Sequence, residues 1–264
     1  MLAKLVLTLS LVGMISCEDP KEAPLVKLPL VIDHSSLPVF TSDLGYEIEL
    51  TSVRMAVQDF SFTTSGQLHT TYIWPTISKY LIPSANAHPG HDQGGEITGE
   101  LLGDFILEWP PNETKKLGIA TLIAGSYRAT NFTFGFGSDN LLTPDDPLVA
   151  HTAVLLGMAS KGERIISFMI MIDAPENRKL MGVPFDAMIE ADTKGELRLR
   201  FNAVDPAEGD TIFDKIDFVD LDEDEDDMIV IAPNLDEVDE AYHTLRRDFL
   251  THDHYSVEFT EIKP

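Results

Sequence analysis

Alternation of apolar and polar residues is the pattern that most constrains the fold of this chain. It is strictest at 196–204, where Leu197, Leu199 and Phe201 are separated by charged residues. Successive side chains of a strand point to opposite faces of a sheet, so a period of two indicates half-buried strands. Long strands are therefore expected at 46–64 and 96–109. Shorter ones are expected at 116–125, 127–137, 152–160, 166–174 and 254–262.

The connections between these segments favour an antiparallel arrangement. They are rich in Gly, Pro, Asn and Asp, which form turns, and they lie at 138–147, 160–163, 173–179 and 191–196. The alternation changes phase near Ser52, which indicates a bulge or bend in the first long strand. The sequence predicts a mainly β fold, an antiparallel β-sandwich of Ig-like or jelly-roll-like type, with one C-terminal α-helix.

The predicted helix spans 234–250. Its apolar residues recur at helical spacing and would share one face, and Asn234 is a plausible N-cap followed by acidic residues in the first turn. Six residues form the expected apolar face: Leu235, Val238, Ala241, Tyr242, Leu245 and Phe249.

The N-terminal segment is treated separately from the fold. Residues 1–16 have the form of a signal peptide, with Lys4 before a short apolar run. The sequence Met14-Ile15-Ser16-Cys17 resembles the lipobox of bacterial lipoproteins, although Met14 stands where Leu is usual. The resemblance implies cleavage before Cys17 and lipidation of its sulfur and new amino group. Residues 17–27 are then a lipidated cysteine and polar tether, and 28–264 a single β-rich domain.

A lipidated Cys17 would attach the chain to a membrane. Two or three acyl chains give stable anchoring, whereas one binds only marginally. We therefore expect a bacterial cell-envelope protein on the periplasmic face or the cell surface, with the choice between inner and outer membrane left open. An ordinary secretory signal with an incidental cysteine is the alternative. Since Cys17 is the only cysteine, an internal disulfide is excluded.

The charge of the chain excludes one class of partner. The formal net charge is −25 at pH 7, and so acidic a surface repels phosphate backbones, so we expect no nucleic-acid binding. Cations and basic partners are attracted instead. Common catalytic motifs (GxSxG, P-loop, HExxH) are not found, and the chain is expected not to be an enzyme.

Residues 29–204 also resemble a group of bacterial envelope lipoproteins with no assigned activity. The resemblance is carried by the segments 40–62, 84–101, 151–173 and 196–201. More distantly, the group is similar to small periplasmic β-sandwich proteins associated with copper. The resemblance implies the architecture and no catalytic residue.

The strongest candidate for a metal site is the sequence His88-Pro-Gly-His91-Asp92. Proline and glycine exclude a helix, but a tight turn brings residues i and i+3 together, so both imidazoles could bind one ion. Zinc takes four ligands, or three and water, and copper(II) favours nitrogen and oxygen ligands. His151 is the preferred third ligand and Asp92 a further one, with His69 a weaker candidate. The alternative is an exposed polar loop without metal.

Two further regions are weaker candidates for metal binding. In an extended segment His252 and His254 would face the same side, although both follow the predicted helix, whose C-terminal dipole favours histidine without a metal. The acidic run at 217–227 fails the EF-hand pattern, which requires glycine at its sixth position and glutamate at its twelfth. That run is expected to be a solvated loop, with weak divalent-cation binding as the alternative.

The sequence therefore predicts a lipid-anchored, non-catalytic protein that binds a zinc or copper ion through the His-Pro-Gly-His turn. The alternative is a structural or interaction module of the envelope, which binds a protein or glycan and no metal. A metal-dependent hydrolase is the least favoured reading.

Overall fold

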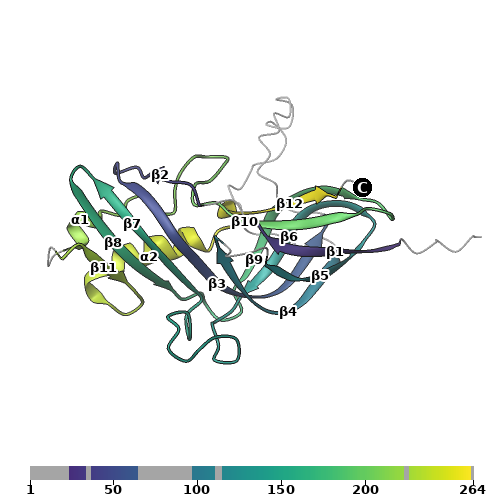
Figure 1. The fold of residues 1–264 in the computed structure, drawn as a ribbon, viewed down its shortest axis with the longest axis horizontal. Coiled ribbons are helices and arrows are strands. Elements are labelled where there is room, and N and C mark those ends of the chain that lie inside the picture. Colours follow the sequence, from purple (N-terminus) through teal and green to yellow (C-terminus); the bar gives the residue numbers. More distant parts are fainter. Residues whose placement is uncertain (1–23, 34–36, 65–96, 111–114, 223–225, 263–264) are drawn as a thin grey trace, which may run out of the picture.

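The computed structural model describes residues 24–33, 37–64, 97–110, 115–222 and 226–262. Within these ranges the chain is mainly β, and its strands join in one sheet (Figure 1). The strands are β1 (Leu25–Ile32), β2 (Phe40–Thr41), β3 (Glu47–Thr63), β4 (Ile97–Trp109), β5 (Lys116–Ile123), β6 (Gly125–Phe134), β7 (Ala153–Lys161), β8 (Arg164–Ile172), β9 (Lys179–Ile189), β10 (Gly195–Phe201), β11 (Met228–Ile231) and β12 (Tyr255–Glu261).

The sheet is mixed, and the expectation of a purely antiparallel sheet is wrong. Its strand order is β11-β8-β7-β3-β4-β5-β1-β10-β12, with β6 pairing to β3 and to β9. Two neighbouring pairs are parallel, β1 with β10 and β11 with β8. In both, the partners are far apart in sequence, so no tight turn forces them antiparallel. Alternation indicates which face of the sheet a side chain occupies. It does not indicate whether the neighbouring strand is parallel or antiparallel.

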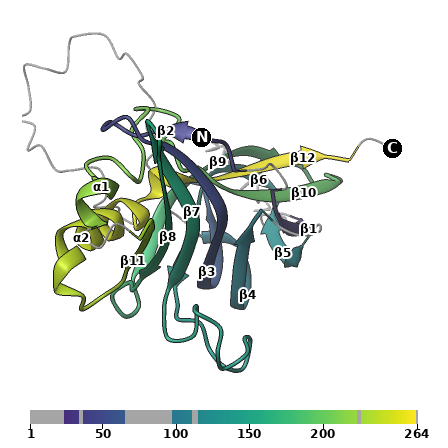
Figure 2. The same cartoon turned by 60° about the vertical axis from the view of Figure 1, so that its left-hand side comes forward.

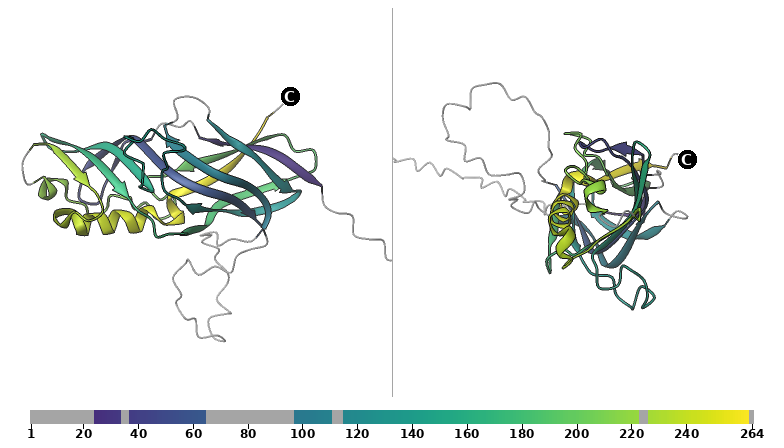
Figure 3. Two further views of the ribbon diagram at one scale, coloured as in Figure 1. Left: turned by 90° about the horizontal axis from the view of Figure 1, so that it is seen from below. Right: turned by 90° about the vertical axis from the view of Figure 1, so that its left-hand side faces the viewer.

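The long strand β3 connects the two parts of the sheet because it changes its pairing partner along its length. Its first half pairs with β7, its second half pairs with β6, and β4 lies along the opposite edge from Val53 onward. The exchange occurs at Ala56, whose N–H donates to Thr152 O (2.8 Å) and whose carbonyl accepts from Gly135 N–H (3.0 Å). In the left view of Figure 3, β3 crosses the middle of the elongated molecule. The register shift between Leu50 and Ser52 confirms the predicted irregularity near Ser52.

The helices gather at one end of the molecule, beside β8 and β11 (Figure 2). They are α1 (Phe218–Leu221), the 3₁₀ turn η2 (Asp236–Val238), α2 (Asp239–Phe249) and the 3₁₀ turn η3 (His252–His254). The expected face of α2 is buried from Val238 to Phe249, but Leu235 is 39% exposed. The helix starts later than 234 because Asn234 has a left-handed φ of +68° and no side chain caps the N-terminus.

The start of the domain also differs from the expectation. β1 begins at Leu25, inside the range 17–27 assigned to the tether, and Leu28, Leu30 and Ile32 are fully buried. β1 pairs with β5 on one side and β10 on the other, so it is an interior strand. Within the described residues no helix has the length and apolar character needed to cross a membrane.

Two groups of aromatic rings make up much of the core. Phe168, Phe213 and Phe218 pack together at the helical end, with ring centroids 5.3–5.9 Å apart. Phe201, Phe249 and Tyr255 pack where α2 ends and β12 begins, at 5.6–6.0 Å. Ring pairs at such separations add to the stabilisation from burial. The second group joins α2 to β10 and β12, so the helix belongs to the same core as the sheet.

Candidate functional site

The structure describes only part of the predicted metal site. Cys17, His69, His88, His91 and Asp92 lie outside the described residues. The predicted residues that it does describe are His151, His252 and His254. His151 lies just before β7, at the place where β6 and β7 exchange along β3.

The ring of His151 is held by a carboxylate. Its Nδ1 lies 2.8 Å from Asp173 Oδ1, and the two side chains are 25% and 33% exposed. An ionised carboxylate only accepts hydrogen bonds, so Nδ1 carries the proton and Nε2 of the neutral ring keeps a lone pair. Metal-binding histidines commonly donate their other ring N–H to a carboxylate in this way. His151 is therefore oriented as a ligand would be, through a residue on the end of β8.

Asp173 is itself fixed by α2. Arg246 Nε donates to the backbone carbonyl of Asp173 (2.6 Å), and the backbone N–H of Asp173 donates to the Tyr242 hydroxyl (3.3 Å). Burial is the main cause that raises the pKa of Tyr242. The helix thus holds the strand end that carries the carboxylate, and the carboxylate holds His151.

The segment between β6 and β7 is anchored by an ion pair. Arg54 on β3 donates from both terminal nitrogens to the carboxylate of Asp146, each at 2.8 Å. Leu148 N–H donates to the same carboxylate at 2.9 Å. The hydrogen bonds from Arg54 are the main cause that lowers the pKa of Asp146. Asp146 lies five residues before His151 in the sequence, but its oxygens bind Arg54 and the loop backbone.

We expect the substitution Asp146→Asn to lower the free energy of unfolding at pH 7 by about 1.5–3 kcal/mol, the usual contribution of hydrogen bonds to a charged group. Because the native pKa of Asp146 is lowered, its contribution is present above the unfolded-state pKa and is lost as pH falls through the native pKa. Urea denaturation should show the difference between wild type and variant shrinking over that acidic range.

The neighbouring substitution Asp145→Asn is the matched control, since Asp145 is exposed and should change stability by about 0.5 kcal/mol or less. A difference between wild type and Asp146→Asn that stays constant down to pH 2 would contradict the assigned role of the Arg54–Asp146 pair.

His252 and His254 lie in η3, not in the extended segment on which their pairing was argued. In a 3₁₀ turn residues i and i+2 do not share a face. His254 is 3% exposed, and its Nδ1 donates to the backbone oxygen of Asn202 at 2.9 Å. Nε2 of His252 lies 3.4 Å from Asp253 Oδ1. The predicted joint metal site at these two histidines is therefore not supported by the backbone.

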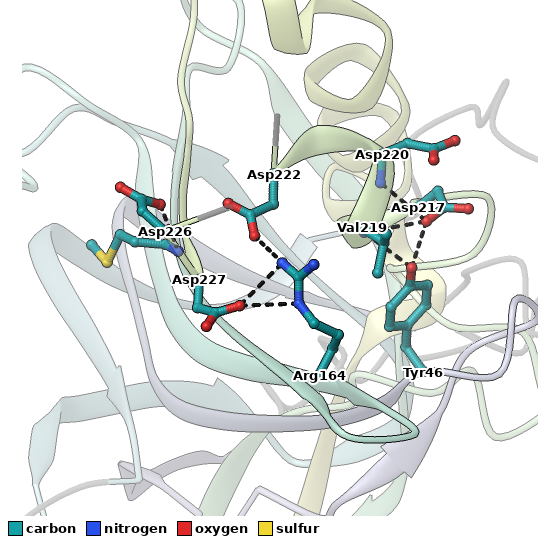
Figure 4. A network of polar contacts seen from close by, with 9 residues as sticks. Tyr46, Arg164, Asp217, Val219, Asp220, Asp222, Asp226 and Asp227 are labelled. Atoms are coloured by element: carbon teal, nitrogen blue, oxygen red, sulfur yellow. Dashed lines mark hydrogen bonds and ion pairs between the residues drawn. The ribbon is translucent and has the colours of Figure 1, made fainter. Parts of the chain in front are cut away.

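The acidic run at 217–227 is largely structural (Figure 4). Arg164 on β8 forms an ion pair with Asp222, whose side chain is 1% exposed, and a second with Asp227 at 3.0 Å. The strand β11, parallel to β8, follows the run directly. The expectation of a solvated loop is thus wrong for Asp222, which is buried against the one guanidinium that neutralises it.

The other end of the same run caps a helix turn. Asp217 accepts hydrogen bonds from the backbone N–H groups of Val219 and Asp220 at the start of α1 and from the hydroxyl of Tyr46. Burial and the bond to Asp217 raise the pKa of Tyr46 to about 12. The same bond is the main cause that lowers the pKa of Asp217. Asp217 therefore serves a structural role and offers little to a cation.

Sequence reasoning missed a different acidic cluster. Asp205, Glu208 and Asp210, on the loop after β10, each place one carboxylate oxygen within 4.8 Å of the other two. The signal in the sequence is Asp-Pro-Ala-Glu-Gly-Asp, where proline and glycine fold three acids onto one turn. Asp173 was also missed as the partner of His151.

Comparison with known proteins does not assign the chain to a family. No family model matches it, and no curated protein or solved structure matches it either.

Proposed function

We propose that this protein is a non-catalytic, lipid-anchored protein of the bacterial cell envelope that binds one divalent transition-metal ion, zinc or copper. Its ligands are His88 and His91 of the turn, with His151 as the third and Asp92 as a further one. The lipid on Cys17 holds it to a membrane. We further propose that the two ends of the sheet pack as a β-sandwich, in keeping with the aromatic core between its strands and α2.

The metal assignment rests on the hydrogen bonding and the exposure of the His151 ring. Its Nδ1 is committed to Asp173, and within the described residues its Nε2 has no hydrogen-bond partner. The His151 side chain is 25% exposed, so a ligand from outside the sheet can reach it. The neutral ring is the form that binds zinc and copper.

The length of the chain allows the turn to meet His151. Ile97, the first residue of β4, pairs with Thr63 on β3, whereas His151 adjoins β3 at Ala56. Seven strand residues separate Thr63 from Ala56, about 23 Å along β3. Six residues separate His91 from Ile97 and span at most about 21 Å when extended. The ligand side chains add several ångströms to this reach, which is then similar to the distance along β3.

The test is metal binding by the full chain, extracted in detergent after expression with its own N-terminal segment and no histidine tag. After reconstitution and dialysis against zinc, copper or nickel, elemental analysis should find about one ion per chain. The double substitution His88→Ala/His91→Ala should abolish this binding. Asp173→Asn should weaken it roughly 10–100-fold, the usual cost of removing a residue that hydrogen-bonds a metal ligand.

The control is His243→Ala, because the His243 side chain is 60% exposed and forms an ion pair with Asp239 on the helix surface. This variant should bind as the wild type does. Less than about 0.1 ion per chain in the wild type would contradict the proposal, and so would equal binding by the His88→Ala/His91→Ala variant. Either result would leave the interaction module as the better reading.

A further inference from the structure

The outward side of the paired strands β1 and β5 carries exposed aliphatic side chains. Leu25 lies opposite Ile123 in the antiparallel register, and Ile119, four residues before Ile123, points to the same side of β5. These three side chains are 66%, 36% and 42% exposed, whereas Ala120, which points to the other side, is fully buried. Exposed aliphatic residues that gather on one surface are typical of contacts with another molecule or with a membrane.

The strand β4 extends this surface on the other side of β5. Glu100 lies opposite Thr121, and the same register places Leu102 opposite Ile119. Leu102 is 64% exposed, and it points outward because its neighbour Leu101 packs against the core. We call the surface formed by Leu25, Leu102, Ile119 and Ile123 the aliphatic face.

The charge of β1 and β5 differs from that of the whole chain. The sequence has 44 Asp and Glu against 19 Lys and Arg, yet each of these strands contains one lysine, Lys27 or Lys116, and no acidic residue. Both lysines are exposed, and Lys27 lies two residues after Leu25, on the same side of β1. Glu100 on β4 is separated from Lys27 by Thr121 of β5. Lysine fits a lipid surface, because its ammonium contacts headgroup phosphates while its stem lies on apolar groups.

The start of β1 lies close to the proposed lipid in the sequence. β1 begins at Leu25, eight residues after Cys17, and eight residues span at most about 29 Å. In Figure 1, β1 begins at the end of the molecule opposite α1 and α2. A lipid on Cys17 therefore keeps the aliphatic face near the bilayer, and a contact within one molecule is favoured by this high effective concentration.

We propose that the aliphatic face lies on the surface of the phospholipid bilayer that holds Cys17, with Lys27 and Lys116 against headgroup phosphates. The inference rests on the lipid anchor of the proposed function and adds a second contact to it. Apolar side chains of proteins bound at an interface enter the headgroup region to a depth of about 5–10 Å. This contact orients the domain on the membrane, which a flexible tether alone does not do.

The test uses Cys17, which is the only cysteine and has no free thiol once it is lipidated. The full chain, expressed with its own N-terminal segment, carries Ile119→Cys or, as the matched control, Ile165→Cys on β8, where the side chain is 57% exposed. Each variant is labelled with a thiol-specific fluorophore and reconstituted into vesicles of phosphatidylethanolamine and phosphatidylglycerol. Lipids with a nitroxide in the headgroup region should lower the fluorescence at position 119 about twofold or more, and at position 165 only slightly.

Charge reversal tests the two lysines. In the Ile119→Cys chain, Lys27→Glu/Lys116→Glu should reduce the quenching to nearly that of Ile165→Cys, because headgroup phosphates repel the new carboxylates. Lys179→Glu, at an exposed lysine of β9, is the control and should leave the quenching unchanged. All three lysines are exposed, so the fold should persist. Equal quenching in the double variant and its parent would contradict the contact of the lysines with phosphate.

The remaining outcomes separate this inference from the lipid anchor. Quenching at position 119 no greater than at position 165, with a wild type that takes up no fluorophore, would overturn the membrane contact and leave the anchor in place. Shielding of the label at position 119 that grows with protein concentration in detergent would assign the aliphatic face to a second copy of the chain. A wild type that takes up the fluorophore has a free Cys17 thiol, and both the anchor and the membrane contact would then be wrong.

Discussion

Replacement of Arg164 by methionine is expected to lower the free energy of unfolding by about 3–5 kcal/mol, the cost of leaving a buried charge without its partner. The Asp222 side chain is 1% exposed, and its carboxylate pairs with the Arg164 guanidinium (Figure 4). Methionine keeps most of the apolar stem of arginine but none of its charge. Urea denaturation at pH 7 should report the loss as a lower midpoint with an unchanged slope.

Two further variants distinguish the effect of an unpaired buried charge from that of removing any arginine. The double substitution Arg164→Met/Asp222→Leu should recover most of the loss, because replacing a whole buried pair by apolar residues is often neutral. Arg128→Met removes an ion pair whose side chains are 45% and 66% exposed, and should cost about 1 kcal/mol or less. A double variant as unstable as Arg164→Met alone would contradict a role for the Asp222 charge.

Periodicity located most strands because they are half-buried. The expected segments at 46–64 and 96–109 correspond to β3 and β4, and six shorter ones to β5, β6, β7, β8, β10 and β12. It missed β1, β2, β9 and β11. β1 follows the polar tether and β2 has only two residues. β11 has only four residues directly after an acidic run, and Pro184 interrupts β9. In such places the choice between strand and loop depends on a partner strand that is remote in sequence.

The sequence was sufficient to predict that His151 and Asp173 lie close together. The tight turn between β7 and β8 pairs Lys161 with Arg164, and this register continues outward to Ala153 and Ile172. Continued by one step, this register places Thr152 opposite Asp173, so His151 is the neighbour of the residue that faces Asp173. The pairing of Arg54 with Asp146 was not within reach, because 92 residues separate them and their contact depends on the partner exchange at β3.

The acidic residues show why charge alone gives no function. Asp217, Asp222 and Asp227 belong to the most acidic run, yet each has a protein donor. The sparser acids Asp205, Glu208 and Asp210 lie close together, and no ion pair is found for them within the described residues. The two regions differ in whether a cationic side chain of the protein lies close enough to pair with the acids. Packing between segments that are distant in sequence decides this.

Truncation of Phe249 to alanine is expected to lower the free energy of unfolding by about 3–5 kcal/mol, the range for large-to-small substitutions of buried aromatic residues. Phe249 is fully buried at the end of α2, packs against Phe201 and Tyr255, and its carbonyl accepts a hydrogen bond from the Tyr255 hydroxyl (3.0 Å). Calorimetry should show a fall in unfolding temperature of roughly 6–20 °C for a domain of this size.

The comparison of Phe249 variants tests whether α2 and the sheet unfold together. Phe249→Leu should cost about 1.5 kcal/mol or less, because most of the volume is kept. Ile165→Ala, at a side chain 57% exposed on β8, should have almost no effect. If α2 shares one core with the sheet, Phe249→Ala should shift a single transition. Two separate transitions in this variant would show that the ring does not couple α2, which holds Asp173, to the strands that carry His151.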